Sequence, residues 1–305
     1  MKIHKFTKEA ARIAEPYRIA KGKKFRLKDW DPADVGHLDS KDGDPKDEAH
    51  ELLEHGTQLL NVLQQKLWAQ DKWALLIILQ GMDAAGKDGV VSHVMSDVNP
   101  QGCEVWSFKQ PSHEELDHDY LWRAHQRVPS RGKIGIFNRS YYEEVLVVRV
   151  HKKLLEAEQL PEAVKGKELW EQRFEDINAF EKYLTHNGVI VRKFFLHLSK
   201  GEQKKRFLAR LDDPQKNWKF SMADIQERGY WKDYQQAYEE LIRETATKHG
   251  PWYVVPADNK WYSRLVVAAA VVETLDSLQL EFPEVDKAKK KELEQVRKLL
   301  VKKKG

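Results

Sequence analysis

Five short apolar runs along the chain predict buried β-strands. They span residues 73–80, 104–108, 133–138, 189–198 and 252–255. The first run is almost continuously apolar, as expected for a parallel strand that is buried on both faces. A stretch long enough to form a helix separates each run from the next. This alternation of strands and helices indicates an α/β fold with a parallel central sheet.

Two of the remaining segments carry apolar residues at the spacing of an amphipathic helix. Before the first strand the stripe is Leu52, Leu59, Leu63 and Leu67, and before the fourth strand it is Phe174, Ile177, Phe180 and Leu184. We interpret the second stripe as ordinary core and expect its helix to stop at Gly188. Ser199 and Glu202 then resemble a capping box that opens a further helix.

The composition is that of a globular chain. Of its 305 residues 41% are hydrophobic, which is enough for a sizeable core. No apolar stretch approaches the roughly 18 residues of a membrane span, and the N-terminus lacks the apolar core of a signal peptide. The single cysteine, Cys103, excludes an intrachain disulfide and is expected to be a small strand residue. These features predict a soluble, cytoplasmic protein without a membrane partner.

The segment directly behind the first strand resembles a phosphate-binding loop. It has Gly81, Gly86 and Lys87 at the spacing of a P-loop, followed by a mostly apolar segment that can be helical. A strand that feeds such a turn aims backbone N–H groups into one concavity, and the following helix adds partial positive charge. Lys87 can then reach the outer phosphates of a polyphosphate group. Gly81, Ala84, Ala85 and Gly86 are the expected backbone donors.

The loop departs from an ordinary P-loop at two acidic positions. Asp88 stands where a Ser or Thr hydroxyl usually binds Mg²⁺. Asp83 lies inside the loop, where a carboxylate would repel a phosphate unless a divalent cation sat between them. We therefore interpret Asp83 as a carboxylate on the Mg²⁺ side, with Asp88 as a candidate second one.

Further candidates follow the other strands, because ligands of open parallel sheets bind beyond the carboxyl ends of the strands. Lys109 follows the second strand, and Asn138, Arg139 and Glu143 follow the third. The guanidinium of Arg139 offers bidentate donors for a phosphate in transfer. An ion pair between Arg139 and Glu143 is the alternative. Glu143 could instead complete the metal site or face a nucleotide.

A basic segment at residues 204–219 contains six basic and two acidic side chains. Because Pro214 breaks the helix and Trp218 can anchor the turn, we interpret the segment as a mobile flap that closes over phosphates. The net charge of only +4 means that anion binding depends on such local clusters. Nucleic acid is a poor alternative ligand, because zinc spacing, an aromatic sheet motif and a clear helix-turn-helix are all missing from the sequence.

Together these blocks resemble the polyphosphate kinase 2 family over residues 25–283. The blocks are residues 81–89, 119–123, 137–149, 210–219 and 251–257. The resemblance implies a thymidylate-kinase-like P-loop fold with a helical lid at about residues 204–230. It also implies reversible phosphoryl transfer between inorganic polyphosphate and a nucleotide, with Mg²⁺ or Mn²⁺. Residues 1–46 would then be an N-terminal extension over the surface, residues 47–283 the phosphotransferase domain and residues 284–305 a basic tail.

Carried over residue by residue, the resemblance assigns roles to the candidates. Asp83, Lys87 and Arg139 take the places of the family's loop acid, loop lysine and strand-end arginine, and Glu143 joins Asp83 as a metal ligand. The candidate lid cations are Arg206, Arg210, Lys216, Lys219 and Arg228. The candidate nucleotide contacts are Asp88, Lys109, Asp119, Arg123 and Asn138.

The sequence after the third strand bears on the choice of acceptor. Family members specialised for making nucleoside triphosphates usually read Asp-Arg-Ser-Trp-Tyr-Asn, whereas this chain has Asn-Arg-Ser-Tyr-Tyr-Glu at residues 138–143. It thus resembles branches that accept nucleoside monophosphate, including those that carry AMP through ADP to ATP. Adenine nucleotides are the expected partners, guanine nucleotides are further candidates, and a homo-oligomer is expected.

Two other functional classes and one other chemistry stay open on the sequence. The classes are an ATP-dependent nucleoside or nucleoside monophosphate kinase, and a nucleotide-binding protein without turnover. Direct in-line attack by the acceptor needs no covalent intermediate. The alternative chemistry is a phosphohistidine route, with His113, His118 or His125 as the carrier.

The C-terminal tail, residues 287–304, has nine basic and two acidic residues, with Leu293, Val296 and Leu300 on one helical face. We expect a solvated terminal helix that packs lightly on the body. A long polyanion that extends onto the tail is the alternative.

Overall fold

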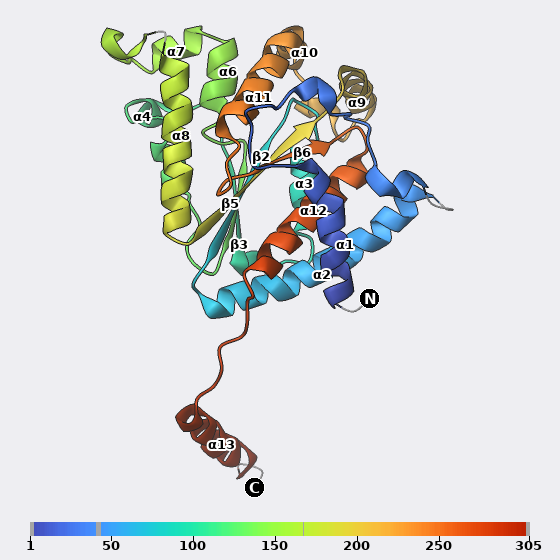
Figure 1. The fold of residues 1–305 in the computed structure, drawn as a ribbon, viewed down its shortest axis with the longest axis vertical. Helices are drawn as coiled ribbons and strands as arrows, with labels where there is room; N and C mark the ends of the chain where they lie inside the picture. Colours follow the sequence, from blue (N-terminus) through green and yellow to red (C-terminus); the bar gives the residue numbers. More distant parts are fainter. Residues whose placement is uncertain (1–2, 41–43, 167, 303–305) are drawn as a thin grey trace.

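A six-stranded sheet forms the centre of the molecule (Figure 1), in the order β1-β6-β5-β2-β4-β3. The computed structural model describes residues 3–40, 44–166 and 168–302. The strands are β1 (Arg18–Ile19), β2 (Ala74–Gln80), β3 (Cys103–Ser107), β4 (Ile134–Asn138), β5 (Val189–His197) and β6 (Trp252–Pro256). All neighbours pair in parallel except β1, which runs antiparallel to β6. The five predicted strands and the α/β fold class are confirmed.

Two layers of helices cover the sheet (Figure 1). The helices are α1 (Ile3–Ala14), α2 (Pro45–Gln70), α3 (Lys87–Val94), α4 (His113–Leu116), α5 (Trp122–His125), α6 (Glu143–Val150), α7 (Lys153–Ala157), α8 (Leu169–His186), α9 (Lys200–Asp212), α10 (Met222–Gly229), α11 (Trp231–Thr245), α12 (Lys260–Ser277) and α13 (Lys287–Lys302). Helices α1, α2, α3 and α12 share one core cluster with the sheet. Helices α5, α6, α8 and α11 share the cluster on the other face. All seven residues of β2 are buried between these layers, as its continuous apolar run predicts.

Local signals set the ends of the helices on either side of β5. In α8, Phe174, Ile177 and Leu184 are buried as predicted. The chain reverses at Gly188, whose φ of 83° lies in the left-handed region that favours glycine. At the start of α9 the Ser199 hydroxyl accepts the backbone N–H of Glu202 at 3.1 Å, which confirms the N-cap half of the predicted capping box. The reciprocal half is replaced, because the backbone N–H of Ser199 donates to Asp258 Oδ1 at 2.7 Å.

The N-terminal segment differs from the predicted surface extension. Phe6, Ala10 and Ile13 of α1 are buried in the core cluster with α2 and α12. Residue Arg18 then pairs with Tyr253, which adds β1 to the edge of the sheet beside β6. A two-residue strand is too short to show an alternating pattern, so it could not be predicted from the sequence. The segment is therefore part of the folded body.

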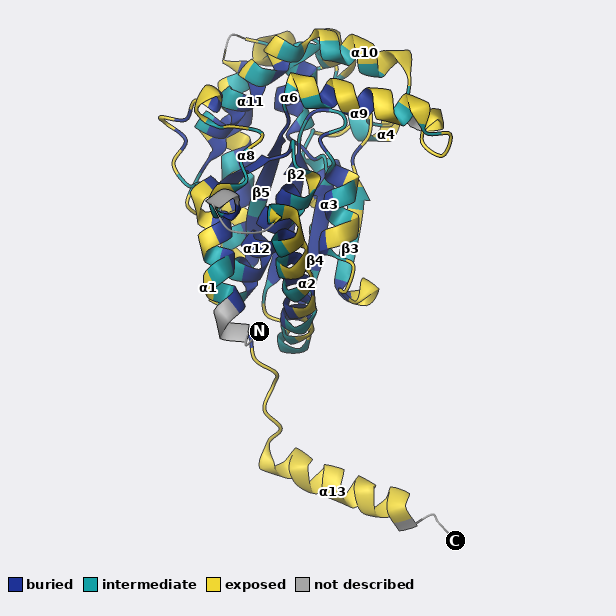
Figure 2. Ribbon diagram, turned by 90° about the vertical axis from the view of Figure 1, so that its right-hand side faces the viewer, coloured by how far each residue is buried: buried dark blue, intermediate teal, exposed yellow. Residues whose placement is uncertain are grey.

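Helix α13 projects away from the body on an extended connection (Figure 2). Its described side chains are exposed, including Leu293, Val296 and Leu300. The expected helix is confirmed, but its light packing on the body is not seen. In both ribbon views α13 lies at the opposite end of the molecule from α9 and α10. None of the helices among the described residues is long and apolar enough to cross a membrane.

Candidate active site

The phosphate loop connects the end of β2 to the first residue of α3, Lys87. Two of its residues have left-handed backbone, Ala84 with a φ of 63° and Gly86 with a φ of 105°. A left-handed conformation is unfavourable for alanine, so the surrounding structure must hold the loop in place. The free N–H groups at the start of α3 therefore face the loop, as an anion-binding turn requires.

The side chain of Lys87 is folded back over its own loop. Its Nζ donates to the carbonyl oxygen of Gly81 at 2.6 Å and lies 3.4 Å from that of Met82. Burial, followed by repulsion from Arg139, lowers the pKa of Lys87 to about 8. The ammonium is thus held where a bound phosphate would meet it, and its charge is sensitive to pH near neutrality.

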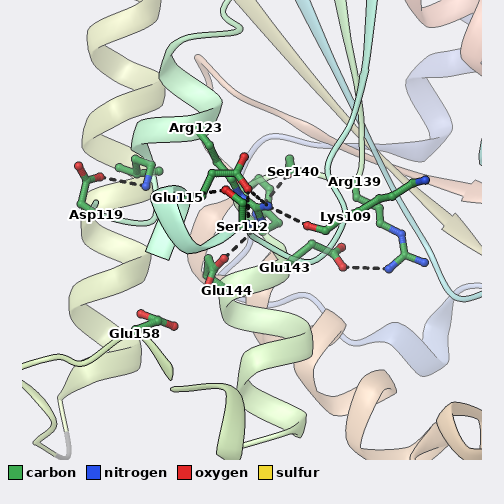
Figure 3. A network of polar contacts seen from close by, with 12 residues as sticks. Lys109, Ser112, Glu115, Asp119, Arg123, Arg139, Ser140, Glu143, Glu144 and Glu158 are labelled. Carbon is green, nitrogen blue, oxygen red and sulfur yellow. Dashed lines mark hydrogen bonds and ion pairs between the residues drawn. The ribbon is translucent and has the colours of Figure 1, made fainter. Parts of the chain in front are cut away.

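Arg139 lies between two acidic side chains at the end of β4. Its Nη2 donates to Asp83 Oδ1 at 3.0 Å. Its Nη1 donates to Glu143 Oε2 at 3.1 Å, as Figure 3 shows. The charge of Glu143 is the largest cause that raises the pKa of Arg139, so the guanidinium stays ionised. The ion pair foreseen as an alternative for Arg139 is present, and it extends to the loop acid as well.

Glu143 is held by a second residue that the sequence reasoning missed. The Nε2 atom of Gln80, the last residue of β2, donates to Glu143 Oε1 at 3.0 Å. Gln80 is fully buried, and its own Oε1 has no partner among the described residues. The available signal was a polar residue at the end of an otherwise apolar strand. Gln80 and Arg139 together engage both oxygens of Glu143.

The two carboxylates suit a magnesium ion that arrives with the substrate. Within residues 3–40, 44–166 and 168–302, no cluster of three or more metal-ligating side chains exists. Mg²⁺ commonly takes one or two protein carboxylates and fills its remaining positions with water and substrate phosphate oxygens. Asp83 and Glu143, which flank the same guanidinium, match that pattern. Asp88 instead accepts a hydrogen bond from Asn138 Nδ2 at 2.6 Å.

A cleft of about 1050 Å³ opens over the loop. It brings together most of the predicted residues, which are Asp83, Ala84, Ala85, Gly86, Lys87, Asp88, Lys109, Asn138, Arg139, Arg206, Arg210 and Lys216. Gly81 and Glu143 lie beside this lining and bond to Lys87 and Arg139, respectively. The strand-end rule and the loop motif therefore converge on one cavity.

Two lining cations were not predicted, Lys260 and Arg264 on α12. A third, Lys205 on α9, belongs to the predicted basic segment at residues 204–219 but was not singled out. Lys260 and Arg264 form no ion pair within the part of the chain that the structure describes. Burial and the nearby charge of Arg206 lower the pKa of both side chains. Both residues come soon after the end of β6, so the rule that selected Lys109 and Arg139 would have found them.

Comparison with known proteins decides the family. Residues 43–283 match the family model Polyphosphate kinase 2 (PPK2). The chain belongs to the polyphosphate kinase 2 family. An ADP-polyphosphate phosphotransferase of Rhodopseudomonas palustris is 51% identical over 92% of this chain and 99% of the relative. An AMP/ADP-polyphosphate phosphotransferase of Meiothermus ruber is 43% identical over 90% of this chain and 97% of the relative.

A solved structure agrees with the assignment. The crystal structure of Polyphosphate Kinase 2 from Arthrobacter aurescens superposes with a TM-score of 0.83 at 41% identity, covering 96% of this chain and 98% of that one. The resemblance inferred from the sequence blocks is confirmed, as is the P-loop kinase-like fold. This polyphosphate kinase 2 chain is thus a transferase whose loop, strand ends and basic helices form one cleft.

In this chain Arg206 does not lie as a free lid cation. Its side chain is buried and donates to the carbonyl oxygens of Ala84 at 2.9 Å and Ala85 at 3.1 Å. It also donates to the carbonyl oxygens of Ala257 and Asp258, in the turn after β6. The guanidinium therefore braces the phosphate loop against the opposite turn. The spacing of basic residues gave no sign of this role, because the partners are backbone atoms distant in sequence.

The rest of the lid is largely helical, as the family resemblance implies. A 3₁₀ turn (Asn217–Lys219) joins α9 to α10, and the exposed Trp218 donates its indole N–H to the Gln215 carbonyl. Arg228 does not line the cleft. It donates to the Gln203 side chain at 2.7 Å, and Gln203 donates to the Asp83 carbonyl at 2.9 Å. The Lys219 side chain lies outside the described residues.

Two predicted nucleotide contacts lie away from the cleft. Arg123 is buried, donates to the Lys109 carbonyl at 2.7 Å and lies 3.7 Å from Glu144 (Figure 3). Asp119 accepts the backbone N–H of Leu121 at 2.9 Å, as a turn-capping residue does. Neither side chain lines the cavity. Lys109 does line it, and Arg123 holds the backbone of Lys109 in place.

The three histidines considered as phosphate carriers also lie outside the cleft lining. His118 stacks on Trp122 with ring centroids 4.0 Å apart. His125 packs edge-on against Phe180. His118 and His125 thus contact aromatic rings rather than phosphate-binding groups, and His113 opens α4 outside the cleft lining. The geometry therefore gives no support to a phosphohistidine route.

Proposed function

We propose that this chain transfers phosphoryl groups reversibly between inorganic polyphosphate and AMP and ADP, with Mg²⁺. The observation that carries the proposal is the number of cations that line the cleft. They include Lys87 and Arg139 at the loop, and Lys205, Arg210, Lys216, Lys260 and Arg264 on α9, α12 and the turn between α9 and α10. A single nucleotide does not need so many cations, whereas a polyphosphate chain carries about one negative charge per internal phosphate. The names of the two relatives described above support the same donor and acceptors.

The proposed mechanism is positioning and charge neutralisation. Donor and acceptor are both anionic, and their repulsion is strong in a cleft of low dielectric. Lys87 and Arg139 hold the reacting phosphates, while the cations on α9 and α12 hold the remainder of the donor. The acceptor phosphate oxygen then attacks in line, and no covalent enzyme intermediate is needed. Asp83 and Glu143 would hold Mg²⁺, or Mn²⁺ in its place, which supplies positive charge between donor and acceptor.

The deciding experiment varies the donor. The chain is incubated with AMP or ADP, Mg²⁺ and either polyphosphate or ATP, and the nucleotide products are quantified by chromatography. We expect ADP and ATP to form with polyphosphate. Transfer from ATP alone would indicate an ATP-dependent kinase, and no product with either donor would indicate a binding protein. A Lys87→Ala preparation purified in the same way controls for contaminating kinases.

A separate prediction concerns the effect of Glu143 on the preference of the enzyme for AMP over ADP. AMP is one phosphate shorter than ADP, so its reacting oxygen lies closer to the base. We expect a different arrangement of the metal ion and the side chains to bring that oxygen to the donor. A carboxylate holds Mg²⁺ better than an amide does. We expect Glu143→Asn to lower kcat/KM for AMP about tenfold more than for ADP, a difference of about 1.4 kcal/mol. The measurement uses one polyphosphate preparation at fixed free Mg²⁺.

The control for this prediction is Glu144→Gln, which removes the neighbouring carboxylate that faces Arg123 rather than the cleft. This variant should change kcat/KM for AMP and kcat/KM for ADP by the same factor. Equal losses for AMP and ADP in Glu143→Asn would make Glu143 a general catalytic or structural group. An unchanged Glu143→Asn enzyme would leave it with no role beyond its ion pair to Arg139.

A further prediction concerns the basic tail. Because α13 lies at the opposite end of the molecule from α9 and α10, only a long polyanion could touch both it and the cleft. Deleting the residues after Asp286 should raise the KM for long polyphosphate severalfold and leave the KM for short chains unchanged. Replacing Lys289, Lys290 and Lys291 by glutamine tests the charge without the deletion. Equal kinetics on both chain lengths would exclude the tail as a donor-binding element.

A further inference from the structure

A charged pair is fully buried near the turn of residues 139–142, which carries Arg139. Glu181 of α8 and Lys193 of β5 each have 0% exposure, and Lys193 Nζ lies 2.6 Å from Glu181 Oε2. The pair lies on the face of the sheet that α6, α8 and α11 cover. Such a pair is often no more stabilising than well-packed apolar side chains of the same volume. Its presence therefore calls for an explanation other than stability.

The hydrogen bonds around the pair are complete. Lys193 uses its two remaining donors on the Tyr142 hydroxyl at 3.0 Å and the Thr245 carbonyl at 2.7 Å. The second carboxylate oxygen of Glu181 accepts from the hydroxyls of Tyr141 at 3.0 Å and Tyr142 at 2.7 Å. Burial raises the pKa of both tyrosines, so both hydroxyls keep their protons. Two adjacent rings are thus directed to one oxygen atom, which gives each ring a single position.

These tyrosines follow Arg139 directly in the chain. Arg139 has a φ of 65°, a left-handed conformation that is unfavourable for any residue with a Cβ. On one side its backbone N–H donates to the Leu79 carbonyl at 3.0 Å. On the other side the Ser140 hydroxyl accepts the backbone N–H of Tyr142 at 3.1 Å. An unfavourable conformation persists only where the surrounding structure fixes it, and the buried pair supplies that restraint through the two tyrosines.

We propose that Glu181, Lys193, Tyr141 and Tyr142 form a positioning network for Arg139. The network fixes the turn of residues 139–142 so that the guanidinium lies between Asp83 and Glu143, where it meets the transferring phosphate. None of the four lines the cleft, so they act through Arg139 and not on the substrate. This inference rests on the function proposed above, because its readout is phosphoryl transfer.

The test replaces Tyr142 by phenylalanine, which keeps the ring and removes the hydroxyl. The matched control is Tyr17→Phe. Tyr17 is equally buried and bonds Asp34 at 2.6 Å and Tyr262 at 3.0 Å, but it belongs to the core cluster on the other face of the sheet. Both variants should lose thermal stability. We expect only Tyr142→Phe to lower kcat, by about tenfold, with little change in the KM for nucleotide.

A double-mutant cycle separates positioning from a general structural role. If the network acts through Arg139, adding Tyr142→Phe to Arg139→Ala should lower kcat no further. Independent losses that multiply would overturn the proposal, and so would a wild-type kcat in Tyr142→Phe. Should Tyr142→Phe fail to fold, Tyr141→Phe removes only one bond to Glu181 and takes its place in the cycle. An inactive wild-type chain would instead refute the proposed function, so the two failures are distinguishable.

Discussion

Replacing Lys87 by alanine should lower kcat about 10²–10³-fold, the loss seen when a single electrostatic donor is removed from an active site. The ammonium lies inside the phosphate loop, where we expect it to neutralise charge that develops as the phosphoryl group moves. Steady-state kinetics at saturating polyphosphate and Mg²⁺ measure the effect. Lys260→Ala is the matched control, because it removes a cation from the same cleft but from its α12 wall. It should act mainly on the KM for polyphosphate.

The fold should survive Lys87→Ala, because among the described residues the Lys87 side chain bonds only carbonyls of its own loop. Unchanged thermal unfolding would establish this. Since the pKa of Lys87 is lowered to about 8, the charge is present below that pH and is lost as the pH rises through it. The value of kcat/KM, which reports the free enzyme, should fall accordingly. A Lys87→Ala enzyme with wild-type kcat would show that the loop lysine is not catalytic.

The second large effect is expected for Asp83→Asn. The substitution keeps the shape of the side chain but removes the charge that pairs with Arg139 and that we propose as a Mg²⁺ ligand. We expect kcat to fall about 10²-fold or more, within the range for single electrostatic groups. The Mg²⁺ concentration for half-maximal rate should also rise, which a Mg²⁺ titration at fixed polyphosphate measures.

The control for Asp83→Asn is Asp88→Asn, the other acid of the loop region. Asp88 bonds Asn138 rather than Arg139, so its loss should be smaller and should leave the Mg²⁺ dependence unchanged. If Asp83→Asn keeps wild-type turnover at saturating Mg²⁺, Asp83 is not a metal ligand. If Asp88→Asn shows the larger shift in Mg²⁺ dependence, the two acids have been assigned in the wrong order.

The features that could be predicted from the sequence each depend on residues that are close together in the chain. The apolar run of β2 and the glycines that follow it lie within a few residues of one another, and the position of Arg139 follows from the end of its strand. Roles set by distant partners could not be predicted. Arg206 stands in a basic run and was assigned to phosphate, yet its bonds to Ala257 and Asp258 join segments about fifty residues away.

The same limit applies to other residues. Arg123 lies in a sequence block typical of the family, but its direction toward the Lys109 carbonyl depends on tertiary packing. The sequence places Glu181 in a predicted helix and Lys193 in a predicted strand, but it does not show that they form a buried ion pair. The spacing of charged residues along a chain does not reveal their burial.

The bonds of Arg206 also decide where the cleft can widen. Gln203, Arg206 and Phe207 fasten the first half of α9 to the phosphate loop and the core, whereas Leu208 and Leu211 are exposed. An opening motion that lifted the whole of α9 would break these bonds and disturb the loop itself. A hinge for such an opening would therefore have to lie beyond Phe207, where Arg210 and Lys216 could move away while the loop stays assembled.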